Sequence, residues 1–420
     1  MLSTYGEILR LNRAWRFSLA GAILRLPSSI MPISVVLSVQ AAYGSYTLAG
    51  AVSAVNIIAL AVMAPILARL VDRYGQLKIM GPALTISAIA TAVMFFATLY
   101  VAPAWIVFVS AGIAGGTWGS PGALVRARWI RSTNTVAQLN SAFALEAAVD
   151  EFVFIVGPVI ATVLGTVLHP TTGVGVSVIF LTIGGTLFLA QRSSEPEPVN
   201  RVVQTDENGQ PIRQKSLLFL PAMIVLMLTY AGMGAQFGAN DISVVAFTKE
   251  LGVPALSGVL LAMFSVGSFI SALIYGARTW RRSLWSLFAI GVVALAIGMS
   301  AYLLAHSILT LGIIMLVSGI ACAPTMTNVN MMVTKTVPRH RQTEGLAWMS
   351  TAINLGVSVG SSASGPAVDR FGSGGGYVMI AVFAWLMVLI MVLGLPTLKR
   401  SLVKSAQEDA EHQREVLDED

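Results

Sequence analysis

The stretch ARLVDRYGQLKIM, residues 68–80, is a short charged turn between two long apolar runs. The run before it covers residues 46–68, and the run after it covers residues 79–100. Each holds about 20 predominantly apolar residues, the length that an α-helix needs to cross the hydrocarbon core of a membrane. The turn therefore predicts two adjacent membrane-spanning helices, and the same alternation continues along the chain.

The composition of the whole chain agrees with this interpretation. The 420 residues have a mean hydropathy of +0.77, and 11% are charged, whereas a soluble domain has roughly 25% charged residues. Cys322 is the single cysteine, which excludes an intramolecular disulfide, and the four scattered histidines have no metal-ligand spacing. We therefore expect an integral membrane protein with no metal, no cofactor and no nucleic-acid partner. No nucleophile or phosphate-binding pattern indicates an enzyme.

Twelve apolar runs are long enough to span a membrane. Placing both chain ends in the cytoplasm puts 23 of the 26 Lys and Arg residues on that side, as the positive-inside rule requires. Lys249 and Arg370 then lie outside, and Arg25 lies within a span. The predicted spans are 17–40, 46–68, 79–100, 104–125, 139–165, 173–191, 217–246, 255–276, 284–304, 309–333, 344–366 and 375–396.

A polar, Pro-rich segment, 192–216, separates the first six spans from the last six and is predicted to be a flexible cytoplasmic linker. The halves, 1–191 and 217–396, contain similar short stretches at nearly constant offset, which supports duplication of a six-helix unit. Residues 397–420 are expected to be a cytoplasmic acidic tail, and its acidic end, 408–420, is expected to be solvated and disordered. The similar stretches are YTLAGAV (46–52) with PALSGVL (254–260) and SAGIA (110–114) with VSGIA (317–321).

The charged turn at 68–80 resembles the signature loop of the major facilitator superfamily. Leu70, Asp72, Arg73 and Gly75 match the core of that motif, while other positions depart from it. The turn lies between spans two and three of a duplicated twelve-span chain, so the resemblance extends over nearly the full length. It implies an all-α fold of two six-helix bundles related by a pseudo-two-fold axis, which transports a small molecule by alternating access.

In that family, the loop holds the cytoplasmic gate shut in the outward-facing state. The resemblance therefore implies a gate of Asp72, Arg73, Gly75 and Arg126. Asp72 is predicted to pair with either arginine or to face the N-terminus of span 11, where the helix dipole favours an anion, and Gly75 permits the turn. An ordinary charged turn is the simpler alternative. A second copy, GPAVDRFG at 365–372, falls on the outer side and cannot do the same job.

Four charged residues fall inside predicted spans of the first half. A helical rise of 1.5 Å per residue puts Arg25 and Asp150 at similar depths, roughly 12 and 16 Å from the cytoplasmic face. Glu146 and Asp150 share a helix face, and Glu151 is turned about 100° further. An unpaired charge at this depth is costly, so we expect Asp150 to pair with Arg25. Glu146 or Glu151 then remains as a proton carrier; a static buried ion pair is the alternative.

Two proline positions predict helix bends that suit a gating function. Pro27 follows Arg25 in span one, and Gly157 and Pro158 lie within VGPVIA of span five. The latter resembles a motif of family members that export by antiport, although only Gly157 and Pro158 match. We therefore expect similarity to the drug and sugar efflux branch.

By analogy with the family, spans 1, 4, 7 and 10 line a central cavity. We predict a monomeric, multi-pass transporter of a bacterial inner membrane that exports a small organic molecule in exchange for protons and uses the proton gradient rather than a cofactor. The alternatives are a proton symporter or uniporter for nutrient uptake, and a membrane sensor that has lost transport. The candidate cavity residues are Trp118, Tyr230, Gln236, Asn240, Asp241 and Asn328.

Overall fold

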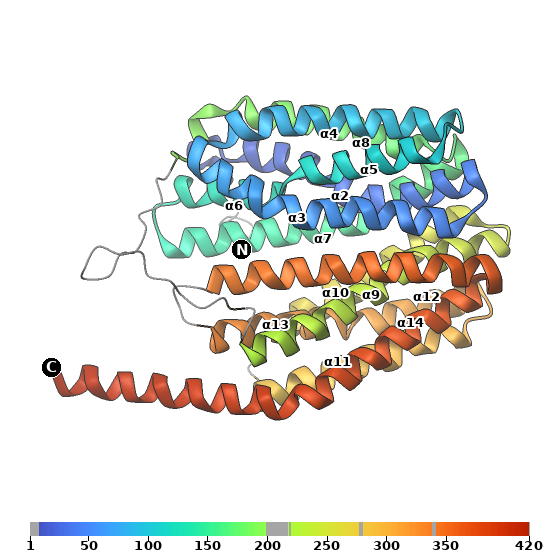
Figure 1. Cartoon of the computed structure of the whole chain (residues 1–420). Coiled ribbons are helices and arrows are strands. Elements are labelled where there is room, and N and C mark those ends of the chain that lie inside the picture. Colours follow the sequence, from blue (N-terminus) through green and yellow to red (C-terminus); the bar gives the residue numbers. More distant parts are fainter. Residues whose placement is uncertain (1–7, 199–216, 218–219, 277–279, 338–341, 420) are drawn as a thin grey trace.

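The computed structural model describes residues 8–198, 217, 220–276, 280–337 and 342–419, and within these it is helical with no strand (Figure 1). Short 3-10 turns cover Leu11–Arg13, Arg192–Ser194, Pro254–Leu256 and Ala301–Leu304. The α-helices are α2 (Trp15–Tyr43), α3 (Tyr46–Tyr74), α4 (Gln76–Leu99), α5 (Ala104–Trp118), α6 (Pro121–Ser132), α7 (Val136–Val167), α8 (Thr172–Leu189), α9 (Pro221–Glu250), α10 (Ser257–Gly276), α11 (Leu284–Ser300), α12 (Ile308–Gly319), α13 (Cys322–Thr336) and α14 (Gln342–Glu419).

The described helices make twelve membrane crossings, which confirms the predicted number. Ten helical segments are individually long and apolar enough to cross, and one of these joins α12 to α13. The pair α5 and α6 forms another crossing, broken at Gly119, where φ is +70°. Within α14, Gly372 has φ +65° and ψ −162°, so this long element is two crossings joined by a turn.

Local sequence signals fix several helix ends. Ser45 caps α3 by accepting a hydrogen bond from the Leu48 amide at 3.1 Å, and Thr135 caps α7 through the Gln138 amide at 3.2 Å. The seventh span was predicted to begin at 217, but α9 begins four residues later, at Pro221. Proline suits the first turn of a helix because the amide hydrogen that it lacks would have no partner there.

Two further predictions differ from the structure. The fourth span was expected to be one helix over 104–125, but Gly119 adopts a conformation that favours glycine, and the chain continues as α6 to Ser132. The end expected to be disordered, 408–420, instead continues α14 as helix to Glu419. In both places a helix-forming sequence extends beyond the apolar run that defined the predicted span.

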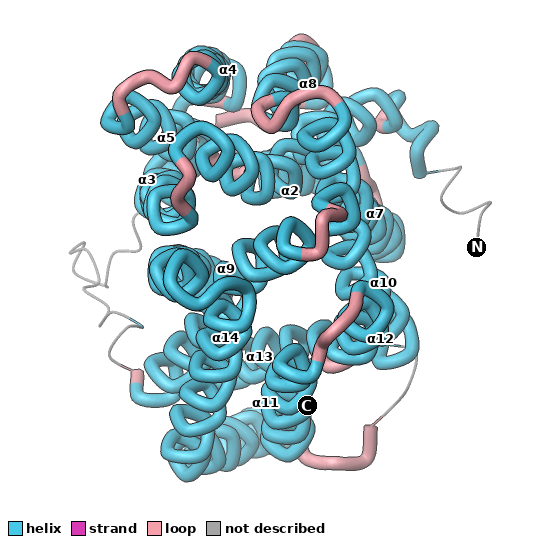
Figure 2. Tube along the Cα trace, turned by 90° about the vertical axis from the view of Figure 1, so that its right-hand side faces the viewer, coloured by secondary structure: helices cyan, strands magenta, loops and turns pink. Residues whose placement is uncertain are grey.

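The helices form two groups, α2 to α8 and α9 to α14, which lie one above the other in Figure 1. The end of the molecule at which α14 ends, on the left, is the side that the charge bias assigns to the cytoplasm. We call the groups the N-terminal and C-terminal bundles. Figure 2 views them from the opposite, outer end.

The bundles contact each other closely in their outer half. Asp369, at the outer end of a crossing in α14, accepts hydrogen bonds from the backbone amides of Tyr46 and Thr47 at 2.8 Å each, and from the hydroxyls of Ser45 and Thr47. The carboxylate thus caps α3 of the other bundle. The outer copy of the loop motif is therefore part of an interface between the bundles.

Further contacts across the same interface lie nearby. Lys249 donates to Gln40 at 2.8 Å, and Ser358 donates to the Ala54 carbonyl at 3.3 Å. Every hydrogen bond described between the two bundles lies in this outer half. These contacts close the outer side of the structure.

Replacing Asp369 with Ala is predicted to weaken the closed outer interface. Loss of a helix cap costs about 0.5–2 kcal/mol, which corresponds to roughly a twofold to thirtyfold shift towards states that are open outside. The measurement is labelling by a membrane-impermeant maleimide from the outer side of right-side-out vesicles. The reporter is Ser358→Cys, a buried interface position, in a Cys322→Ser background. Labelling should become faster by that factor.

The matched control is Arg370→Ala, at the exposed neighbouring position. It should leave the labelling rate of Ser358→Cys unchanged. Equal rates in the parent, Asp369→Ala and Arg370→Ala would show that the Asp369 contacts do not hold the outer side closed.

Candidate functional site

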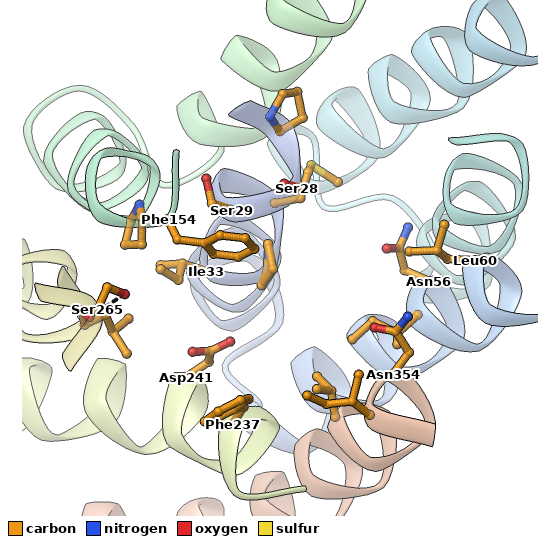
Figure 3. A pocket seen from close by; sticks show the side chains of 18 of the residues that line it. Ser28, Ser29, Ile33, Asn56, Leu60, Phe154, Phe237, Asp241, Ser265 and Asn354 are labelled. Atoms are coloured by element: carbon orange, nitrogen blue, oxygen red, sulfur yellow. Dashed lines mark hydrogen bonds between the residues drawn. The ribbon is translucent and has the colours of Figure 1, made fainter. Parts of the chain in front are cut away.

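A cavity of about 580 Å³ lies between the two bundles, and both contribute to its wall. This volume is within the range of roughly 300–1,000 Å³ that is typical of small-molecule sites. Ser28 and Asn56 come from the N-terminal bundle, and Phe237, Asp241 and Asn354 come from the C-terminal bundle (Figure 3). The described residues that line the cavity include acidic side chains but no Lys, Arg or His.

A buried ion-pair network stands beside this cavity in the N-terminal bundle. Arg25 of α2 is only 4% exposed, and its Nη2 atom pairs with Glu146 Oε2 of α7. Its Nη1 atom pairs with Asp150 Oδ1 at 2.7 Å, and the other oxygen of Asp150 accepts from Arg126 Nη2 of α6 at 2.8 Å. Two guanidinium groups and two carboxylates balance, so the network is neutral when all four groups are ionised.

Glu146 is the most enclosed member of the network. It has no exposed surface, and its Oε1 atom accepts hydrogen bonds from Ser18 Oγ at 2.6 Å and Trp129 Nε1 at 2.7 Å. Together with Arg25, three side chains donate to this one carboxylate. Such a group holds α2, α6 and α7 together, because loss of one partner would leave a buried charge uncompensated.

The sequence positions these groups through helix geometry. Glu146 and Asp150 are one turn apart on the same face of α7, so both reach a single arginine on α2. Arg126 and Trp129 lie on α6, which begins with Pro121 after the break at Gly119. The network therefore includes Glu146 in addition to the predicted partner of Arg25, Asp150.

Glu151 differs from its two acidic neighbours. It is rotated about 100° from Asp150 around α7 and lines the cavity, where it makes no hydrogen bond or ion pair to any described residue. It is half-buried rather than enclosed. Glu151 is therefore the acidic surplus that the sequence predicted.

Of the six predicted cavity residues, the structure places half on the wall. Trp118, Asn240 and Asp241 line the cavity. The three others are buried elsewhere and do not reach it: Tyr230 packs in the core, Gln236 donates to the Gly232 carbonyl and to Met387 Sδ, and Asn328 accepts from the Tyr275 hydroxyl at 2.7 Å.

The physical reason for this division is the orientation of α9. Residues 237, 240 and 241 share one face of the helix, at spacings of three and four, and this face lines the cavity. Gln236 lies on another face, towards α14. The helix is apolar on most sides, so its sequence gives no strong indication of which face meets the cavity.

The structure also adds cavity residues that the sequence analysis did not single out. Phe237 could have been found from its spacing of four from Asp241. Phe154 lies one turn beyond Asp150 on α7 and could have been found in the same way. Asn56 and Asn354 lie on α3 and α14 without any recognisable motif, so no signal in one sequence identifies them.

The predicted gate residues do not form one cluster in this state. Asp72 and Arg73 are exposed at the cytoplasmic end of α3, and Asp72 makes no ion pair with a described residue. Arg73 lies over the ring of Tyr74, at 5.1 Å from its centroid. Gly75 has φ +96°, in the region that favours glycine. Arg126, expected at the gate, instead pairs with Asp150 deeper in the bundle.

The residues predicted to bend helices lie where helices pack closely. Both α2, which contains Pro27, and α7, which contains Pro158, continue as helix through the proline. Pro27 and Pro158 line the cavity. Gly157 faces Ser29 of α2 with no room for a side chain, so this glycine permits close approach of the two helices.

Comparisons with known proteins agree with this architecture. A sequence model described as Major Facilitator Superfamily matches residues 17–276 and 226–417. A search of curated proteins found no match. Solved structures, however, include many similar chains.

Three of these structures show the extent of the similarity. The nucleoside transporter NupG has a TM-score of 0.67 at 14% identity, with 92% of this chain and 99% of that chain covered. The human organic anion transporter MFSD10 has a TM-score of 0.62 at 13% identity, with 91% and 99% covered. A bacterial homolog of the human lysosomal transporter Spinster, inward-facing and occupied, has a TM-score of 0.64 at 13% identity, with 96% and 97% covered.

At these identities the solved structures show a shared fold, and the sequence match spans nearly the whole chain. The protein is therefore a multi-pass membrane transporter of a small molecule and belongs to the Major Facilitator Superfamily.

Proposed function

We propose that the protein is a proton-coupled antiporter that exports small organic molecules by alternating access, with Glu151 as the proton carrier. The observation that carries the proposal is the difference between Glu151 and its acidic neighbours. Glu146 and Asp150 are neutralised by Arg25 and Arg126, while Glu151 faces the cavity without a partner among the described residues. Its charge can therefore change without breaking the ion-pair network.

The position of Glu151 suits exchange of protons with the cytoplasm in this state. The outer side is closed by contacts such as those of Asp369, whereas Glu151 lies in the cavity between the bundles. A carboxylate that takes up a proton from outside in one state and releases it inside in the other uses the proton gradient to drive a cycle. A structure that is closed on its outer side, as this one is, fits the release step of that cycle.

The direction of export rests on the resemblance at Gly157 and Pro158. These residues follow Glu151 on α7 by about two turns, so the proton carrier and the antiport-like motif belong to one helix. Pro158 lines the same cavity as Glu151, and Gly157 packs against Ser29 of α2. A rearrangement at this helix contact would therefore act directly on the wall that holds Glu151.

Substitution of Glu151 with Gln is predicted to abolish proton coupling while leaving the fold intact. Purified protein in proteoliposomes with an imposed pH gradient and an internal pH dye would be tested with a panel of drugs and sugars. In the parent, movement of a substrate across the membrane in one direction should drive protons across it in the opposite direction. Glu151→Gln should exchange substrate without that proton movement. Glu197→Gln, on an exposed side chain, is the matched control and should behave as the parent.

The same assay tests the alternatives. Proton movement in the same direction as substrate would indicate a symporter, and transport without proton movement in the parent would indicate a uniporter. If Glu151→Gln remains fully coupled, the carrier is another group. Transport of no compound by any variant would favour the non-transporting sensor.

Glu146→Gln is predicted to destabilise the protein far more than Glu151→Gln. The amide cannot balance Arg25, and its NH₂ group adds a donor among three existing donors. Breaking a buried ion pair costs about 3–5 kcal/mol, and the remaining Asp150 contact favours the lower end. Thermal unfolding in detergent should show a clear decrease in Tm for Glu146→Gln and little change for Glu151→Gln. Equal Tm values would contradict the structural role of Glu146.

A further inference from the structure

Besides Glu151, the cavity wall contains one more acidic group that has no partner among the described residues, and the proposed proton cycle does not use it. Asp241 of α9 belongs to the C-terminal bundle, and its carboxylate points into the cavity (Figure 3). It makes no hydrogen bond or ion pair with a described residue. Because no Lys, Arg or His lies among the described wall residues, nothing in this wall neutralises Asp241.

Asn240, the residue next to Asp241, provides an independent observation. Its side chain lines the cavity and is only 5% exposed, and its amide oxygen has no hydrogen-bond partner among the described residues. A buried polar atom without a partner is costly, so such atoms in a binding cavity mark places where a ligand donates a hydrogen bond. Asn240 therefore adds an unpartnered oxygen acceptor to the wall beside the carboxylate of Asp241.

The surrounding wall suits a ligand with an apolar body. Phe237 and Phe264 pack edge to face with ring centroids 5.9 Å apart, and both line the cavity. Phe154 lies on the opposite side, on α7 (Figure 3). Aromatic faces attract cations and also bury apolar groups, so they favour an organic cation over a small hydrated ion.

We propose that Asp241 is the substrate-recognition residue of this cavity and that the substrate is an organic cation with an apolar body. The inference rests on the proposed function, in which Glu151 carries the proton, and it assigns the second unpaired carboxylate to the substrate. The cation offsets the charge of Asp241, and the aromatic side chains contact its apolar groups. One carboxylate from each bundle thus serves one of the two exchanged species.

Two ions of opposite charge and nearly equal shape test the charge requirement: tetraphenylphosphonium and tetraphenylborate. Binding would be measured by equilibrium dialysis or calorimetry with the full chain in detergent, without a proton gradient. The parent should bind the phosphonium and not the borate. Asp241→Asn should weaken phosphonium binding by about tenfold or more, because it removes the charge that pairs with the ligand.

Control variants separate recognition from folding. Asp241→Glu keeps the charge and should retain phosphonium binding within a few fold of the parent, and Glu197→Gln should match the parent. Thermal unfolding of each variant shows whether it is folded. If Asp241→Asn does not fold, Asp241→Glu and the comparison of the two ions still test the proposal. Equal binding of both ions, or preference for the borate, would overturn it.

The assignment of roles has its own test. If Glu151→Gln rather than Asp241→Asn loses phosphonium binding, or if Asp241→Asn loses proton coupling and keeps binding, Asp241 is not the recognition residue. Binding in detergent needs no proton movement, so the two proposals can fail separately. Coupled transport without phosphonium binding overturns only the substrate class. Phosphonium binding through Asp241 without proton movement overturns only the coupling.

Discussion

The ion pairs of Arg25 are the constraint on which the N-terminal bundle depends. A guanidinium group in the interior of a membrane protein is costly unless carboxylates neutralise it and accept its hydrogen bonds. Glu146 and Asp150 do both, and Arg126 balances the second carboxylate. The network thereby fixes α2, α6 and α7 relative to each other. It also leaves Glu151 as the acidic side chain of this helix whose charge is not committed to structure.

Sequence reasoning predicted part of this network and missed the rest for a geometric reason. Depth along two spans placed Arg25 beside the acidic face of α7, and that argument needs only helix rise and residue spacing. Trp129 and Arg126 reach the network because the fourth crossing breaks at Gly119 and restarts as α6. The hydropathy of the fourth span shows one continuous apolar run. Hydropathy therefore could not predict the break at Gly119 or the positions of Arg126 and Trp129, which depend on that break.

The C-terminal bundle shows the same limit in another form. The number of crossings follows from apolar length, and it was predicted correctly. The face that each helix turns to the cavity does not follow, because helices in lipid are apolar on nearly all sides and the 3.6-residue period carries little information. Asp241 lines the cavity while Gln236 and Tyr230 do not, and packing against neighbouring helices decides this.

Under the proposed function, the placement of one free carboxylate in each bundle gives a physical reason for obligatory exchange. A change of state that closes the cavity removes water from Glu151 and Asp241, and two ionised carboxylates are costly in such surroundings. A proton on Glu151 removes one charge on the inward path, and a cation bound at Asp241 offsets one charge on the outward path, so each loaded form carries one charge fewer than the empty cavity. An empty, fully ionised cavity would therefore resist closure. Transport would be restricted to the loaded forms, without a separate mechanism that senses the substrate.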